Sequence, residues 1–173
     1  LGWDLTLNKL RILMGKMFRE HEYLENSVIL SEVEKNLFNK YWKNWENLTE
    51  SDIEAALPIL MELLYKHHGE RVIVLIDEYD APLLDSNSDS ALQGQLRTEM
   101  RKFFSPLKAQ GQYLRFLFLT GISKFSQMSI FSELNNLQNI SLRDDYSAIC
   151  GITEQELRTQ LHIDIEQTSQ ANK

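Results

Sequence analysis

RVIVLIDEYD, residues 71–80, is the segment from which the fold class follows most directly. Residues 72–76 are an unbroken run of β-branched and aliphatic side chains that does not alternate with polar ones. Such a run is typical of a strand that is buried on both faces of a parallel sheet. The run ends abruptly in Asp77 and Glu78. The sequence therefore predicts an α/β fold with two carboxylates at the end of a buried strand.

A second apolar segment, residues 114–120, follows an amphipathic helical pattern at residues 92–107. Strand, helix and strand in this order predict two parallel neighbours joined by a right-handed crossover. Further along, residues 139–142 are expected to form a short strand. Thr153 and Glu156 have capping-box spacing and predict a last helix.

The N-terminal third of the chain is helical by its periodicity. Apolar residues recur at three- and four-residue steps in three stretches, which lie within residues 3–18, 33–45 and 53–64. Ser51 and Glu54 have the spacing of a capping box for the third helix, and Gly69 is suited to its left-handed end. Pro58 inside this pattern predicts a kink or a late helix start.

Composition and charge exclude several classes of protein. With 18 Lys and Arg against 25 Asp and Glu, 7 Gly and 3 Pro in 173 residues, the chain is neither disordered nor collagen-like. Its net charge of −7 argues against direct nucleic-acid binding by this segment. No apolar run is close in length to a membrane-spanning helix, which needs about 20 residues. The single cysteine, Cys150, rules out an intramolecular disulfide, predicts a cytoplasmic location and is expected to be buried.

The ends of the two predicted strands are the best candidate for a site, because ligands bind at the carboxyl ends of strands in open α/β sheets. Aliphatic residues followed by Asp-Glu are typical of the Walker B strand of ATPases. In that interpretation Asp77 binds Mg²⁺ through water and Glu78 activates the attacking water. Thr120, or else Ser123, senses the γ-phosphate at the neighbouring strand. In the alternative interpretation, the two acids only solvate the exit of the strand.

Four segments together resemble the AAA-ATPase-like family of bacterial proteins: RVIVLIDEYDAPLL, LRTEMRKFFSPLK, RFLFLTGISKFSQMSIFSELNNLQNISL and YSAICGITEQEL. In this family a P-loop ATPase domain is commonly followed by a PD-(D/E)XK-type nuclease domain. The resemblance implies ATP and Mg²⁺ as ligands, Mg²⁺ binding by Asp77 and water activation by Glu78. It also implies that Thr120 and Ser123 lie near the phosphates. A nuclease domain of the same protein and a homo-oligomer are the partners that it suggests.

The phosphate-gripping motif of that family, G-x-x-x-x-G-K-[ST], does not occur in the sequence. The only Gly-Lys pair, Gly15-Lys16, has Leu10 at the first glycine position and Met17 in place of Ser or Thr. We therefore interpret the chain as a fragment of a larger ATPase that lacks the Walker A region, so that the missing P-loop segment is also a partner. The expected fold is a partial P-loop NTPase of the ASCE/AAA-like type, a parallel sheet flanked by helices with a helical N-terminal third.

In this scheme the partial ATPase domain spans residues 1–150. Residues 1–70 form its helical segment, and residues 71–142 carry the Walker B strand, the crossover helix and the sensor strand. Residues 151–173 begin a following helical segment.

Three functions are compatible with the acidic run. The first is ATP hydrolysis within the larger protein, with this chain alone inactive. The second is a catalytically degenerate ATPase fold that serves as a scaffold or interaction module. The third, a nuclease metal site made of Asp77, Glu78 and Asp80, is disfavoured because no Lys stands two residues after Glu78 or Asp80. Asp80, which precedes Ala81 and Pro82, is better explained as a turn opener than as a second metal ligand.

Overall fold

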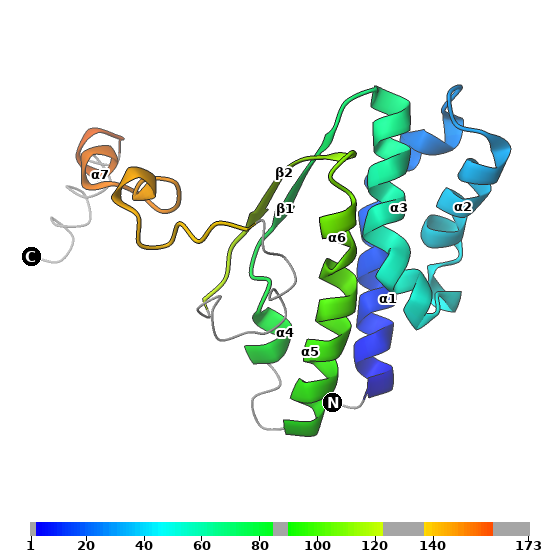
Figure 1. The fold of residues 1–173 in the computed structure, drawn as a ribbon, viewed down its shortest axis with the longest axis horizontal. Coiled ribbons are helices and arrows are strands. Elements are labelled where there is room, and N and C mark those ends of the chain that lie inside the picture. The colour runs from blue at the N-terminus through cyan, green and yellow to red at the C-terminus, as the bar shows by residue number, and fades with distance from the viewer. Residues whose placement is uncertain (1–2, 85–89, 123–136, 161–173) are drawn as a thin grey trace, which may run out of the picture. The chain divides into compact units, whose positions relative to one another are not determined.

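The computed structural model describes residues 3–84, 90–122 and 137–160. It is mostly helical and contains one small parallel sheet (Figure 1). The chain divides into two compact units, residues 1–136 and 137–173. Across the parts that the structure describes, no helix has the length and apolar character needed to cross a membrane.

The described residues of the first unit contain, in chain order, α1 (Trp3–Arg19), η1 (Glu22–Asn26), α2 (Glu32–Lys43), η2 (Trp45–Asn47), α3 (Glu50–His68), β1 (Val72–Ile76), α4 (Ala81–Leu84), α5 (Ser90–Phe104), α6 (Pro106–Ala109) and β2 (Leu114–Leu119). The second unit contains η5 (Asp144–Tyr146) and α7 (Glu154–Gln160).

The three N-terminal helices surround a common apolar core. Buried residues from all three helices and from their connections form it, namely Met14, Phe18, Leu24, Leu30, Phe38, Tyr41, Leu48, Ile53, Ala56, Leu60, Leu63 and Leu64. The ring of Phe18 stacks on that of Tyr41 with centroids 4.4 Å apart. The hydroxyl of Tyr41 donates to the carbonyl of Asp52 at 2.8 Å, so the polar end of this buried ring is satisfied. The three predicted amphipathic helices are confirmed.

Helix α3 begins two residues before the predicted start. The hydroxyl of Thr49 accepts the N–H of Asp52, and the Asp52 carboxylate accepts the N–H of Thr49. Asp52 thus completes the capping box in the place that Glu usually takes. A search for the usual Ser/Thr-x-x-Glu pattern does not find this capping box. The end is as predicted, with Gly69 at φ 70°. Pro58 lies inside the continuous helix, so the predicted late start is wrong.

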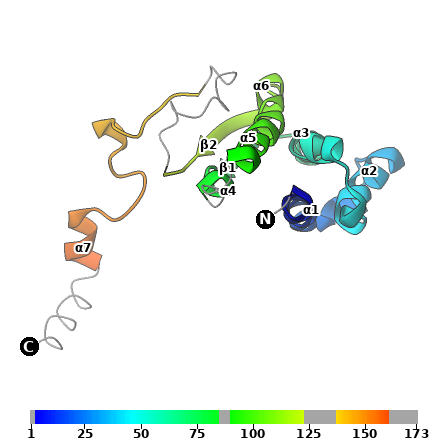
Figure 2. The same ribbon diagram turned by 90° about the horizontal axis from the view of Figure 1, so that it is seen from below.

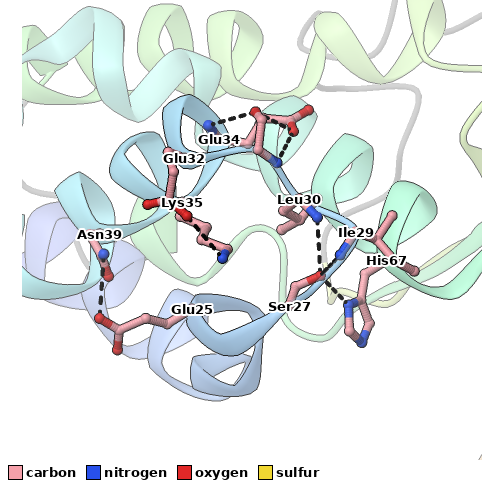
Figure 3. A network of polar contacts seen from close by, with 10 residues as sticks. Glu25, Ser27, Ile29, Leu30, Glu32, Glu34, Lys35, Asn39 and His67 are labelled. Carbon is pink, nitrogen blue, oxygen red and sulfur yellow. Dashed lines mark hydrogen bonds and ion pairs between the residues drawn. The ribbon is translucent and has the colours of Figure 1, made fainter.

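Polar contacts fix the connection between η1 and α2 (Figure 3). The hydroxyl of buried Ser27 accepts the N–H groups two and three residues later, at 3.2 and 3.3 Å, and bonds to Nδ1 of His67 at 2.8 Å. Ser31 caps α2, and its N–H and hydroxyl donate to Glu34 at 2.8 and 2.7 Å. Lys66 of α3 also pairs with the Glu34 carboxylate. Glu34 therefore joins the start of α2 to the end of α3.

This arrangement predicts an acid-dependent part of the stability. The bonds from Lys66 and Ser31 lower the pKa of Glu34 from 4.5 to about 2. Because the folded-state pKa is depressed, the stabilisation is fully present above the unfolded pKa and is lost as the pH falls from about 4.5 through 2. We expect Glu34→Gln to lose about 1 kcal/mol or less of unfolding free energy at pH 7, because solvent screens this partly exposed pair.

Urea denaturation at pH 7 and pH 3 measures this effect. The drop in unfolding free energy between the two pH values is expected to be smaller for Glu34→Gln than for the parent. Glu32→Gln is the matched control, because exposed Glu32 pairs with Lys35 of its own helix, at 3.2 Å. An equal drop in the parent and in Glu34→Gln would show that the Glu34 pair contributes nothing.

Strands β1 and β2 pair in parallel, with Val74 opposite Leu117. They are joined through α5 and α6, as the sequence predicts. The predicted burial of β1 on both faces is wrong for the described residues. Val74 is buried, but Ile73 and Leu75 on the opposite face are 53% and 69% exposed. The reason is that α3 and α5 lie on the same side of the strands in both views (Figures 1 and 2).

The second unit contains the predicted last helix. The N–H of Thr153 donates to the Glu156 carboxylate at 2.8 Å, and the N–H of Glu156 donates to the Thr153 hydroxyl at 3.2 Å. The strand predicted at 139–142 is wrong. The side chain of Asn139 instead accepts the N–H two residues later, at 3.0 Å, and this local bond competes with extended pairing. Cys150 is exposed rather than buried.

Candidate functional site

The carboxyl ends of β1 and β2 bring Asp77 and Thr120 into contact. The ladder of backbone bonds continues past the strands, from the Thr120 N–H to the Ile76 carbonyl at 2.9 Å and from the Tyr79 N–H to the Thr120 carbonyl at 3.0 Å. The hydroxyl of Thr120 donates to the Asp77 carboxylate. The N–H of Glu78 lies 3.0 Å from Oδ1 of Asp77 and 3.3 Å from Oγ1 of Thr120. Three residues that directly follow two strands, Asp77, Glu78 and Thr120, thus share one cluster of hydrogen bonds, which we call the rim cluster.

Glu78 has an unusual backbone conformation, with φ at 50°. Among the residues that the structure describes, no other residue except glycine has a positive φ. This left-handed conformation costs a residue with a Cβ about 1–2 kcal/mol. The bonds to its N–H and the bond from the Ala81 N–H to its carbonyl, at 2.9 Å, hold the turn. Strain of this kind gathers at functional sites.

The rim cluster offers oxygen ligands of the type that Mg²⁺ prefers. The Asp77 and Glu78 side chains are exposed, and the Thr120 hydroxyl orients the Asp77 carboxylate. Magnesium keeps several of its waters and takes one or two carboxylates from a protein. The described residues contain no group of three or more His, Cys, Asp or Glu side chains that could hold a metal ion. The fit to Mg²⁺ therefore depends on Asp77 and on water.

The next two residues in the chain, Tyr79 and Asp80, are buried. The Asp80 carboxylate accepts the N–H of Ile122 at 3.3 Å, and its carbonyl accepts the N–H of Leu83 at 3.0 Å, in α4. Asp80 thus opens a helical turn, as the sequence favours. Burial and, second, the nearby Asp80 raise the pKa of the Tyr79 hydroxyl.

Gly121 lies directly against this buried pair. A Cβ at Gly121 would come within 2.6 Å of both Oδ1 of Asp80 and the ring of Tyr79. The contact of Asp80 with the segment after β2 does not follow from the sequence pattern. A glycine directly after a polar strand end was the available signal, because such a glycine often marks a close approach.

The remaining sequence-based candidates lie elsewhere. Ser123, the second predicted phosphate sensor, lies outside the described residues. Gly15 and Lys16 lie within α1, where a Cβ at Gly15 would come within 2.7 Å of Trp45. This glycine therefore serves close packing between α1 and η2.

A second polar cluster lies before β1, near the end of α3. The hydroxyl of Tyr23 lies 3.3 Å from Nδ1 of His21 and 2.9 Å from Nε2 of His68. Burial lowers the pKa of His21, and the charge of Glu20 acts against this shift. His68 is in the last turn of α3. This cluster precedes β1, whereas the rim cluster follows it.

Comparison with known proteins shows a family and a relative. A family model described as "Predicted AAA-ATPase" matches residues 10–131, which include both strands and the rim cluster. A protein of Azotobacter chroococcum mcd 1, described as an uncharacterized protein in the vnfD 5′ region, is 44% identical over 109 residues. These residues are 63% of this chain and 21% of that protein, so the chain spans about a fifth of that relative's length. No solved structure matches the chain.

Proposed function

Because the chain belongs to the AAA-ATPase-like family, we propose that its rim cluster takes part in Mg²⁺-dependent ATP hydrolysis. One observation carries the proposal: Asp77, Glu78 and Thr120 share hydrogen bonds where two parallel strands end. Ligands of open α/β sheets bind at this edge. The family match supports the use of a nucleotide.

Each residue of the rim cluster has a distinct task in this proposal. Asp77 holds the ion through its carboxylate and ordered water, and bound Mg²⁺ supplies charge neutralisation at the phosphate oxygens. Glu78 orients the attacking water and accepts its proton. The Thr120 hydroxyl donates to the Asp77 carboxylate and so orients it. In this proposal Thr120 also contacts the γ-phosphate.

In this proposal, residues outside the described part of the chain bind the other phosphates of ATP. Backbone N–H groups of a P-loop and its Lys normally bind them. We propose that a P-loop in another segment of the protein does so here, and the much greater length of the Azotobacter relative supports this view. The family resemblance also supports a nuclease domain in the same protein and a homo-oligomer. The single cysteine supports a cytoplasmic location.

Removal of the Thr120 hydroxyl tests this proposal. In the full-length protein, Thr120→Val is expected to raise the Mg²⁺ concentration for half-maximal ATP hydrolysis by about tenfold or more, because one hydrogen bond to a charged group is lost. Thr120→Ser is the matched control, because it keeps the hydroxyl. A Thr120→Val protein with parental turnover and parental Mg²⁺ dependence would contradict the proposal.

A second candidate function is a degenerate ATPase fold that serves as an interaction module. The exposed apolar face of the sheet, with Ile73, Leu75 and Phe116, favours it, because such faces often bind another surface. The complete reading frame of the gene separates the two functions. A G-x-x-x-x-G-K-[ST] motif upstream of this chain supports hydrolysis, and its absence from the whole frame supports the interaction module.

A further inference from the structure

Asp80 differs from the other acids of the DEYD run by its burial. Its side chain is only 1% exposed, whereas those of Asp77 and Glu78 are exposed. Burial of a carboxylate is costly unless hydrogen bonds satisfy it. One such bond comes from the N–H of Ile122, 42 positions later in the chain. A contact with the segment that follows β2 is therefore one of the interactions that satisfy this buried acid.

The glycine between Thr120 and Ile122 gives independent support for this contact. A Cβ at Gly121 would come within 2.6 Å of the Asp80 carboxylate, a distance that real Cβ atoms essentially never show. No positive φ accounts for this glycine, so its lack of a side chain is what the contact requires. The segment after β2 thus lies too close to Asp80 to leave room for a side chain at position 121.

We propose that Asp80 is a positioning residue, whose buried carboxylate ties residues 120–122 to the turn that carries Asp77 and Glu78. The proposal rests on the proposed function of the rim cluster. Two hydrogen bonds hold the backbone around Thr120. The Tyr79 N–H donates to the Thr120 carbonyl, and the Ile122 N–H donates to the Asp80 carboxylate. Together they hold the Thr120 hydroxyl against the Asp77 carboxylate.

The competing role for Asp80 is that of a second metal ligand. Burial argues against it, because a hydrated ion at the exposed Asp77 carboxylate stays in contact with solvent. The two roles require different properties of the side chain. A tie needs only an acceptor oxygen, which Asn also has. A carboxylate that ligates Mg²⁺ contributes its negative charge as well as its oxygen, so Asn at that position binds the ion more weakly.

The test compares Asp80→Asn with Asp80→Ala in the full-length protein by kcat, the KM for ATP and the Mg²⁺ dependence. We expect Asp80→Asn to stay near the parental values. Asp80→Ala is expected to lower kcat by about tenfold, to raise the Mg²⁺ requirement as Thr120→Val does, and to leave the KM for ATP unchanged. A loss in Asp80→Asn as large as that in Asp80→Ala would overturn the proposal in favour of a metal ligand. Parental kcat in Asp80→Ala would overturn it as well.

A second variant covers the case in which Asp80→Ala does not fold. Gly121→Ala places a Cβ against the Asp80 carboxylate and is expected to lower kcat in the same way. Gly111→Ala is its matched control, because a Cβ there meets no atom within 4 Å. Equal kcat values for the two glycine variants would refute the tie.

Hydrogen exchange at the Ile122 amide separates this proposal from the function on which it rests. We expect slow exchange in the parent and in Asp80→Asn, and faster exchange in Gly121→Ala. This readout needs no hydrolysis. A parent protein without ATPase activity but with a protected Ile122 amide would therefore refute the proposed function and the positioning role while leaving the contact itself established. Fast exchange in an active parent would refute the tie alone.

Discussion

Glu78→Gln is expected to leave ATP binding by the full-length protein intact and to lower kcat by about a hundredfold to ten-thousandfold, the usual contribution of a general base. The amide of Gln keeps the shape of the side chain but does not accept a proton from the attacking water. The left-handed turn at residue 78 and its backbone bonds stay as they are. Calorimetric titration with ATP and steady-state hydrolysis measure the two quantities separately.

Glu70→Gln is the matched control for this experiment. Glu70 is also exposed, but it precedes β1, whereas Glu78 follows it. The same chemical change is therefore expected to leave kcat at the parental value. If Glu78→Gln hydrolysed ATP as fast as the parent, Glu78 would not be the residue that activates water.

Gly15→Ala is expected to lower the free energy of unfolding by about 1–3 kcal/mol, the usual cost of overpacking. The new Cβ would lie 2.7 Å from Cγ and 2.9 Å from Cβ of Trp45. These atoms are close to the Trp45 backbone, so η2 has to shift away from α1 to make room. Urea denaturation measures the effect.

Gly94→Ala is the control, and it is expected to change the free energy of unfolding in the opposite direction. Gly94 also lies inside a helix, α5, but a Cβ there meets no atom within 4 Å. Alanine is a better helix former than glycine, so this variant is expected to gain about 0.5–1 kcal/mol. If both variants were stabilised, the close packing of Gly15 on Trp45 would not exist in the folded protein.

The elements that the sequence predicts correctly are those with local signals. The aliphatic run of β1, the periodic stripes of α1 to α3 and the left-handed end at Gly69 each depend on neighbouring residues alone. The exposure of Ile73 and Leu75 could not be predicted in the same way. An apolar run indicates a strand, but its burial depends on which elements cover each face.

The rim cluster was predictable in part. Parallel strands end at one edge, so the pattern places Asp77 and Thr120 together, and the structure brings them into contact. The contact of Asp80 with Ile122 joins residues far apart in the chain and has no periodic signal. The positive φ of Glu78 was equally hidden, because Glu is not a residue that favours this conformation.

The left-handed backbone of Glu78 makes the residue that best stabilises the turn different from the residue that the proposed activity requires. Glycine adopts a left-handed conformation without strain, so selection for a stable fold alone favours glycine at position 78. If Glu78 activates water, as proposed, selection for that activity is what retains a glutamate at this strained position. In a lineage that no longer needed the activity, we therefore expect position 78 to be among the first of this turn to change to glycine or asparagine.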